Sequence, residues 1–130
     1  MMQLIKNLSE PKNLLVVCVL YTVIITLLFL VPLHTGTTST IPIDKLVHFS
    51  LNGALVFLWG FYLTKKSGVT HWKNLLFVLL FAIIYGIIIE ILQEELTTSR
   101  MADLWDVVAN TLGCFAGLFF LKLFKIKFSS

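Results

Sequence analysis

Apolar residues are concentrated in four long runs that are separated by short polar stretches. The first run contains no charged residue, whereas Glu90 interrupts the third run and Asp106 the fourth. A bilayer core about 30 Å thick needs about 20 helical residues, and about 17 can suffice. The pattern therefore predicts four transmembrane helices, at residues 14–33, 44–64, 74–93 and 103–122.

The composition favours a protein that is embedded in a membrane. Hydrophobic residues make up 58% and charged residues 13% of the 130 residues, and the mean hydropathy is +0.92. Soluble domains contain about 45–50% apolar and about 25% charged residues. The first run is also longer than the roughly 7–15 apolar residues of a cleaved signal peptide, and no A-x-A cleavage site follows it. We therefore expect an all-α integral membrane protein, a four-transmembrane-helix bundle that forms a single domain over residues 1–130.

Basic residues are distributed unevenly along the chain. Eight of the ten Lys and Arg residues lie near the two chain ends or between the second and third apolar runs. They are Lys6, Lys12, Lys65, Lys66, Lys73, Lys122, Lys125 and Lys127. Because the cytoplasmic loops of membrane proteins collect Lys and Arg, both termini are predicted to be cytoplasmic, and the loops at 34–45 and 93–103 to be extracytoplasmic. The same placement accounts for the net charge of +3 without a nucleic-acid partner.

Each of the last three predicted helices carries one narrow stripe of polar or small residues. At 100° per residue, the members of each stripe fall within about 80° around the helix axis. The stripe of the second helix consists of Asp44, His48 and Asn52, that of the third of Ala82, Gly86, Glu90 and Gln93, and that of the fourth of Asp103, Asp106, Asn110, Gly113 and Gly117. The first helix carries no such stripe.

These stripes are expected to face one another. A charged side chain at the centre of a membrane helix costs roughly 2.5–3.5 kcal/mol, so such residues should avoid lipid. His48, Glu90 and Asp106 all lie within about one or two helical turns of the same, outer interface. The small residues of the stripes let neighbouring helices approach closely. The sequence therefore predicts a polar pocket in the outer leaflet, formed by the second, third and fourth helices.

The same region carries motifs that resemble those of a known family. They are DKLVHF at residues 44–49, E-x-x-Q from Glu90 to Gln93, and R-x-x-D-x-x-D-x-x-x-N-x-x-G-x-x-x-G from Arg100 to Gly117. Together they resemble the VanZ-like membrane protein family, although members often have a proline near the arginine, where this chain has Thr98-Ser99. The resemblance implies a small protein of the bacterial cytoplasmic (inner) membrane. The founding member is associated with tolerance to the glycopeptide antibiotic teicoplanin, and the resemblance implies no established reaction.

The predicted function is to bind or remodel a polar molecule of the cell envelope. A lipid-linked cell-wall intermediate or an anionic lipid headgroup fits the location, with a link to glycopeptide tolerance. An ionisable residue inside a membrane is by default a candidate for a functional site, and Arg100 suits bidentate binding of a phosphate or carboxylate. The predicted ligand-binding residues are Arg100, Asp103, Gln93, Asn110, Asn52, Asp44 and Lys45.

Two alternatives remain open. In the first, the protein is an intramembrane hydrolase or transferase, in which Glu90 or Asp106 is the general base and His48 transfers protons as acid and base. Arg100 would then anchor the negative charge that develops during the reaction. In the second, the polar residues only hold the helices together through interhelical hydrogen bonds, and Asp103 caps a helix beside Arg100.

No metal and no other cofactor is predicted. One histidine and several carboxylates would suit a divalent ion, but the sequence has no HExxH motif and no second imidazole beside His48. His34 and His71 fall on opposite sides of the membrane in the predicted topology. Cys18 and Cys114 have no metal-binding or redox spacing, and we expect them to pack as small apolar residues. The expected partners are the lipid bilayer and the envelope molecule.

Overall fold

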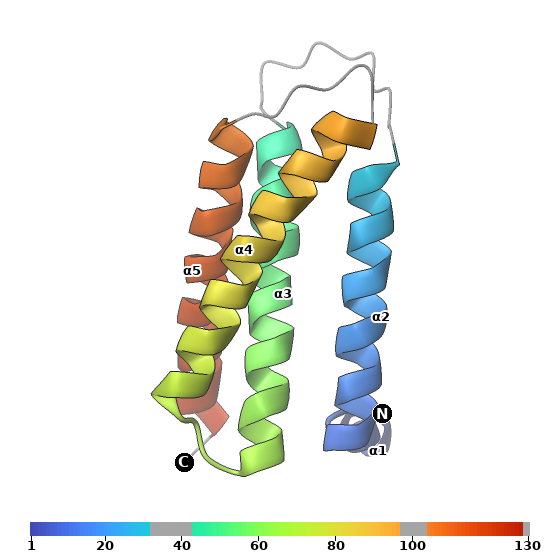
Figure 1. Ribbon diagram of the computed structural model, residues 1–130. Coiled ribbons are helices and arrows are strands. Elements are labelled where there is room, and N and C mark those ends of the chain that lie inside the picture. Colours follow the sequence, from blue (N-terminus) through green and yellow to red (C-terminus); the bar gives the residue numbers. More distant parts are fainter. Residues whose placement is uncertain (32–42, 97–103, 129–130) are drawn as a thin grey trace.

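The computed structural model describes residues 1–31, 43–96 and 104–128, with side chains up to Phe124. The helices in these ranges are α1 (Met2–Leu8), α2 (Pro11–Leu30), α3 (Ile43–Ser67), α4 (Trp72–Leu96) and α5 (Leu104–Phe128) (Figure 1). Of the described helices, α2 to α5 are long and apolar enough to cross a membrane. The prediction of an all-α protein with four membrane spans is confirmed, and the chain is a multi-pass membrane protein.

The observed helix ends differ from the predicted ones for local reasons. α2 begins at Pro11, which is tolerated there because the first amide groups of a helix have no acceptor within it. The same helix ends at Leu30, since Val31 is extended and precedes Pro32, a position that disfavours helical backbone. α1 is not among the predicted helices, because its seven residues are too few to show an apolar period.

A tight turn joins α3 to α4. Gly68 has a φ of 74°, a left-handed conformation that glycine adopts without a steric penalty. Its amide donates a hydrogen bond to the carbonyl oxygen of Thr64, and the Ser67 hydroxyl donates to the carbonyl oxygen of Val69. These contacts end α3 and reverse the direction of the chain, so that α4 runs back along the bundle.

α3 lies at the centre of the bundle. It packs against α2, α4 and α5, whereas α2 and α5 are not direct neighbours in the described part of the chain. The interface between α3 and α5 is the most extensive one. A Cβ atom placed on Gly113 would collide with the carbonyl oxygen of Phe49, and one placed on Gly117 with that of Gly53. Glycine thus lets the two backbones touch, as small residues commonly do between membrane helices.

Hydrogen bonds help to attach α2 to its neighbours. The Tyr21 hydroxyl donates to a backbone carbonyl of α3 at 2.7 Å, and the Trp59 indole N–H donates to the Thr22 hydroxyl at 3.0 Å. Thr26 and Tyr85 share a 2.7 Å hydrogen bond between their hydroxyl groups. The sequence does not predict these contacts, because aromatic and hydroxyl residues are also common where helices meet the membrane interface.

The two chain termini lie at the same end of the bundle (Figure 1). We call the opposite end the loop end; it is formed by the last residues of α2 and α4 and the first residues of α3 and α5. The basic residues of the turn between α3 and α4 lie at the end that contains the termini. The side of the membrane that each end faces stays a prediction.

The predicted topology has a direct test. Ser67→Cys, at the last residue of α3, should resist a membrane-impermeant maleimide in intact cells and react after permeabilisation. Leu96→Cys is the matched control, since Leu96 is 65% exposed at the loop end of α4, and it should react in intact cells. The native Cys18 and Cys114 give no background signal because both are fully buried. Labelling of the first variant alone in intact cells would invert the topology.

Candidate functional site

Six polar side chains from α3, α4 and α5 are buried in the bundle. Each of these residues is at most 6% exposed. They are His48, Asn52, Glu90, Gln93, Asp106 and Asn110. All six belong to the predicted stripes, whereas the stripe residue Asp44 is 47% exposed and Asp103 lies outside the described residues. We call these six residues the polar cluster.

Two amides connect the middle of the polar cluster. Asn52 Nδ2 donates to the backbone carbonyl oxygen of His48 (3.0 Å) and to Asn110 Oδ1 (2.7 Å). The bond to a backbone carbonyl fixes which end of the Asn52 amide is nitrogen, and therefore which end of the Asn110 amide is oxygen. Gly86 of α4 leaves room for this amide, because a Cβ atom there would lie 3.1 Å from Asn110 Nδ2. Asn110 therefore lies where α3, α4 and α5 meet.

The same contacts define the protonation of the His48 ring. His48 Nδ1 lies 3.1 Å from Asn110 Oδ1, and an amide oxygen can only accept a hydrogen bond, so Nδ1 carries the proton. In the neutral ring, Nε2 then carries the lone pair. Nε2 lies 3.8 Å from Asp44 Oδ1 and 3.8 Å from Asp106 Oδ2, beyond hydrogen-bond distance. The ring of Phe29 stacks on the imidazole, with ring centroids 4.8 Å apart, and holds Nε2 toward the two carboxylates.

Lys45 and Asp106 form an ion pair at the loop end of the polar cluster. Lys45 Nζ lies 2.6 Å from Asp106 Oδ1, while Asp106 Oδ2 faces His48. The Asp106 side chain is 8% exposed and the Lys45 side chain 29%. The pair therefore connects the buried polar cluster to the surface of the bundle.

α4 contributes Glu90 and Gln93 to the polar cluster. Gln93 Nε2 donates to a backbone carbonyl of α2 at 2.7 Å. Glu90 lies one turn nearer the loop end than Gly86, and Asp106 lies one turn nearer it than Asn110. Because a Cβ on Gly86 would touch Asn110, both carboxylates lie on the loop-end side of that contact. The common depth that the sequence predicted for the two acids is observed.

Eight of the ten predicted site residues lie within the described ranges. His48, Asn52, Asn110, Asp106, Lys45 and Asp44 are brought together around the His48 ring, and Glu90 and Gln93 approach from α4. Arg100 and Asp103 lie outside the described residues. Anion binding by Arg100 and helix capping by Asp103 stay predictions.

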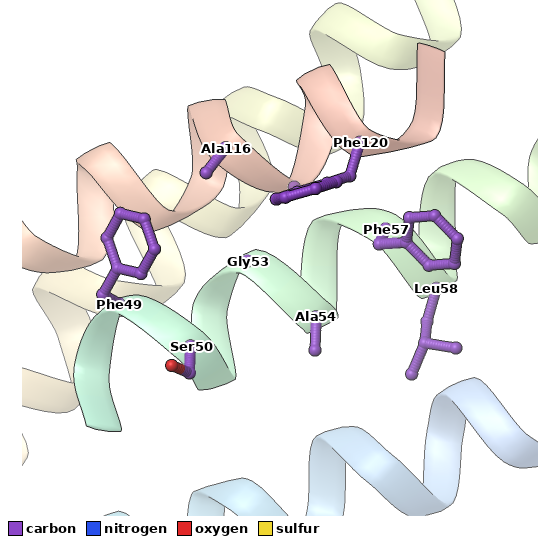
Figure 2. A pocket seen from close by; sticks show the side chains of 9 residues that line it. Phe49, Ser50, Gly53, Ala54, Phe57, Leu58, Ala116 and Phe120 are labelled. Carbon is purple, nitrogen blue, oxygen red and sulfur yellow. The ribbon is translucent and has the colours of Figure 1, made fainter. Parts of the chain in front are cut away.

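An apolar groove runs beside the polar cluster. Figure 2 shows it between α3 and α5, with Phe49, Phe57 and Phe120 along its walls and Gly53 between them. Its volume is about 530 Å³. A second apolar cavity of about 300 Å³ lies among α2, α3 and α4, next to Trp59. No residue of the polar cluster lines either of these two cavities, since the polar side chains pack against one another instead.

The chain matches the model of a known protein family. The VanZ/LLP1 family model matches residues 2–125, nearly the whole chain. This range includes all ten residues of the predicted site. No curated protein and no solved structure matches the chain.

Proposed function

This chain belongs to the VanZ/LLP1 family, and we propose that it binds the polar headgroup of a cell-envelope lipid at the loop end of its bundle. The ligand is a lipid-linked cell-wall intermediate or an anionic phospholipid. The site lies in the outer leaflet of the bacterial cytoplasmic membrane. By binding or remodelling this lipid, the protein contributes to tolerance of glycopeptide antibiotics such as teicoplanin.

One observation carries this proposal, namely the burial of six polar side chains at a single end of an otherwise apolar bundle. Interhelical hydrogen bonds in bilayers contribute only about 0.6 kcal/mol each on average. A charged side chain at the centre of a membrane helix costs roughly 2.5–3.5 kcal/mol. Burying several polar side chains together in a membrane is therefore costly unless they serve a purpose, and a ligand-binding role supplies one.

The surroundings of the polar cluster suit a lipid. Lys45 presents its ammonium group at the loop end, where headgroups lie, and its partner Asp106 connects it to the buried residues. The apolar groove begins at Phe49, next to His48 in the chain, and extends along α3 and α5 to Phe57 and Phe120. A lipid with its headgroup at Lys45 would thus find an apolar surface for an acyl chain on the same pair of helices.

The geometry of His48 supports a second candidate function, catalysis by an intramembrane hydrolase or transferase. Its Nδ1–H is held by Asn110, and its Nε2 faces two carboxylates. A histidine held in this way can take up or release a proton at Nε2, as general acid–base catalysis requires. In an intramembrane hydrolase or transferase, Glu90 or Asp106 would be the general base and Arg100 would bind the negative charge.

Headgroup binding can be measured with purified protein. We expect Lys45→Gln to weaken binding of a phosphorylated polyprenol or of phosphatidylglycerol at least tenfold, about 1.4 kcal/mol. The change removes a cation and leaves the carboxylate of Asp106 to repel the phosphate. Native mass spectrometry with each lipid in turn distinguishes the two ligand classes, with phosphatidylcholine as the neutral comparison.

Lys66→Gln is the matched control for this measurement. Lys66 lies at the opposite end of α3, where its ammonium is 5.9 Å from the centroid of the Tyr62 ring. Its loss should leave specific binding unchanged. Equal losses in the two variants would indicate attraction to the membrane surface in general and would count against a site at the loop end.

A further inference from the structure

We propose that Asp44, His48 and Asp106 bind a divalent transition-metal ion, for which Zn²⁺ is the best fit. The ligand atoms are His48 Nε2, Asp44 Oδ1 and Asp106 Oδ2, and the three residues offer atoms that all lie within 4.8 Å of one another. Two of these residues are one helical turn apart on α3, and the third comes from α5. The sequence alone argued against a metal because it offered no second imidazole; the structure brings two of its carboxylates to the His48 ring.

The state of the His48 ring points to a cation. Nδ1 donates a hydrogen bond to Asn110 Oδ1, so Nε2 is the atom that faces the two carboxylate oxygens, and in the neutral ring it carries the lone pair. The ring is 1% exposed, and at 3.8 Å neither oxygen is within hydrogen-bond distance of Nε2. A positive ion at the point that these three atoms face would accept the lone pair of Nε2 and would be held by the two carboxylate oxygens.

The spacing of the three atoms fits a metal ion. Zn²⁺ binds imidazole nitrogen at about 2.0–2.1 Å and carboxylate oxygen at about 2.0–2.2 Å. In a tetrahedral site with bonds of this length the ligand atoms lie about 3.3–3.5 Å apart, so the observed 3.8 Å from Nε2 to each oxygen would have to shorten by about 0.3–0.5 Å. Asp44 is 47% exposed, so its side chain can adjust to bring the third ligand to the same distance. Three protein ligands with one open position are typical of zinc sites that also bind a substrate or water.

The groups around the three ligands are also those of a metal site. A histidine that binds a metal nearly always donates its other ring N–H to an oxygen acceptor, and metal-binding carboxylates are themselves hydrogen-bonded. Here Asn110 accepts from His48 Nδ1, and Lys45 contacts Asp106 Oδ1 while Oδ2 is directed at His48. His48 and Asp106, the two buried ligands, are thus each oriented by a second residue. Imidazole suits Zn²⁺ better than Mg²⁺ or Ca²⁺, which prefer oxygen ligands throughout.

The ion would hold a phosphate oxygen of the headgroup at its open position, beside Lys45. This role rests on the function proposed above, whereas binding of the ion itself does not. The two can be tested separately, because metal binding needs no lipid and headgroup binding can be measured with and without a chelator.

The test uses tag-free, full-length protein in detergent, stripped with a chelator and titrated with Co²⁺ as a coloured substitute for Zn²⁺. We expect one Co²⁺ per chain, with the visible absorption of a four-coordinate site, and displacement by Zn²⁺. His48→Gln and Asp44→Asn should each lower the affinity by at least about 10–100-fold, the loss typical of removing even an outer-shell partner. Glu94→Gln, an exposed acid near the end of α4, is the matched control and should bind like the wild type.

Asp44→Asn keeps the test decisive, since Asp44 is largely at the surface and its loss should leave the melting temperature unchanged. A wild-type protein that binds no Co²⁺, or an Asp44→Asn variant that binds it as tightly as the wild type, would overturn the metal site. Headgroup binding that persists at full strength in chelator would overturn the role of the ion and leave the proposed function standing. Loss of headgroup binding in chelator, restored by Zn²⁺, would support both.

Discussion

Gly117→Ala should destabilise the protein by about 2–3 kcal/mol, in the upper part of the range for an overpacked core. The added methyl group would collide with the carbonyl oxygen of Gly53. A long side chain can rotate away from such a clash, but a backbone oxygen moves only if α3 and α5 separate along their length. Thermal unfolding in detergent, followed by circular dichroism, measures the change.

Leu112→Ala is the matched control on the same helix. Leu112 is 56% exposed toward the surface that lipid covers, so its truncation should change the stability by no more than about 0.5 kcal/mol. Gly113→Ala should resemble Gly117→Ala, because its methyl group would meet the carbonyl oxygen of Phe49. If Gly117→Ala melts with the wild type, the close contact between α3 and α5 is wrong.

Asp106→Asn should abolish the function of the protein while its fold survives. Asparagine keeps the shape and one acceptor of the side chain, so the loss to packing is about 0.6 kcal/mol, the average for one interhelical hydrogen bond. The variant loses the charge that pairs with Lys45 and faces His48. The measurements are teicoplanin tolerance of a deletion strain that carries the variant, and the melting temperature of the same protein after extraction.

The comparison of phenotype with stability separates a functional site from packing. For Glu90→Gln, Arg100→Lys and Asp106→Asn we expect tolerance to be lost at a nearly unchanged melting temperature. Glu94→Gln, which removes an exposed carboxylate from the same end of the bundle, should keep both. Tolerance that falls in proportion to the melting temperature across the series would show that the polar cluster only holds the helices together.

The sequence predicted the membrane spans well because the bilayer imposes a length and an apolar character that can be recognised residue by residue. It also predicted which residues of α3, α4 and α5 turn inward, since a charged residue that faces lipid is costly. Helix ends were less predictable. The end of α2 depends on the pair Val31–Pro32, and α1 has too few residues to show a pattern.

The sequence could not predict which atoms of the polar cluster pair with one another. Stripe positions predict that His48 and Asp106 share a region, but they do not say which nitrogen or oxygen faces which neighbour. That detail depends on the separation of α3 and α5, which Gly113 and Gly117 set, and on the orientation of the Asn110 amide. Polar contacts of α2 through Thr22 and Tyr21 were missed because these residue types also occur at lipid-facing positions.

The most extensive interface joins two helices that the ribosome makes at different times. His48 and Asn110 are 62 residues apart, and at about 5–20 residues per second synthesis of the later partner takes about 3–12 s. α3 also has the lowest hydropathy of the four spans, 1.5, so it enters the bilayer with buried-type polar groups and with its main partner still unmade. A chain that stops before α5 would leave His48 and Asn52 without Asn110, their hydrogen-bond partner on that helix.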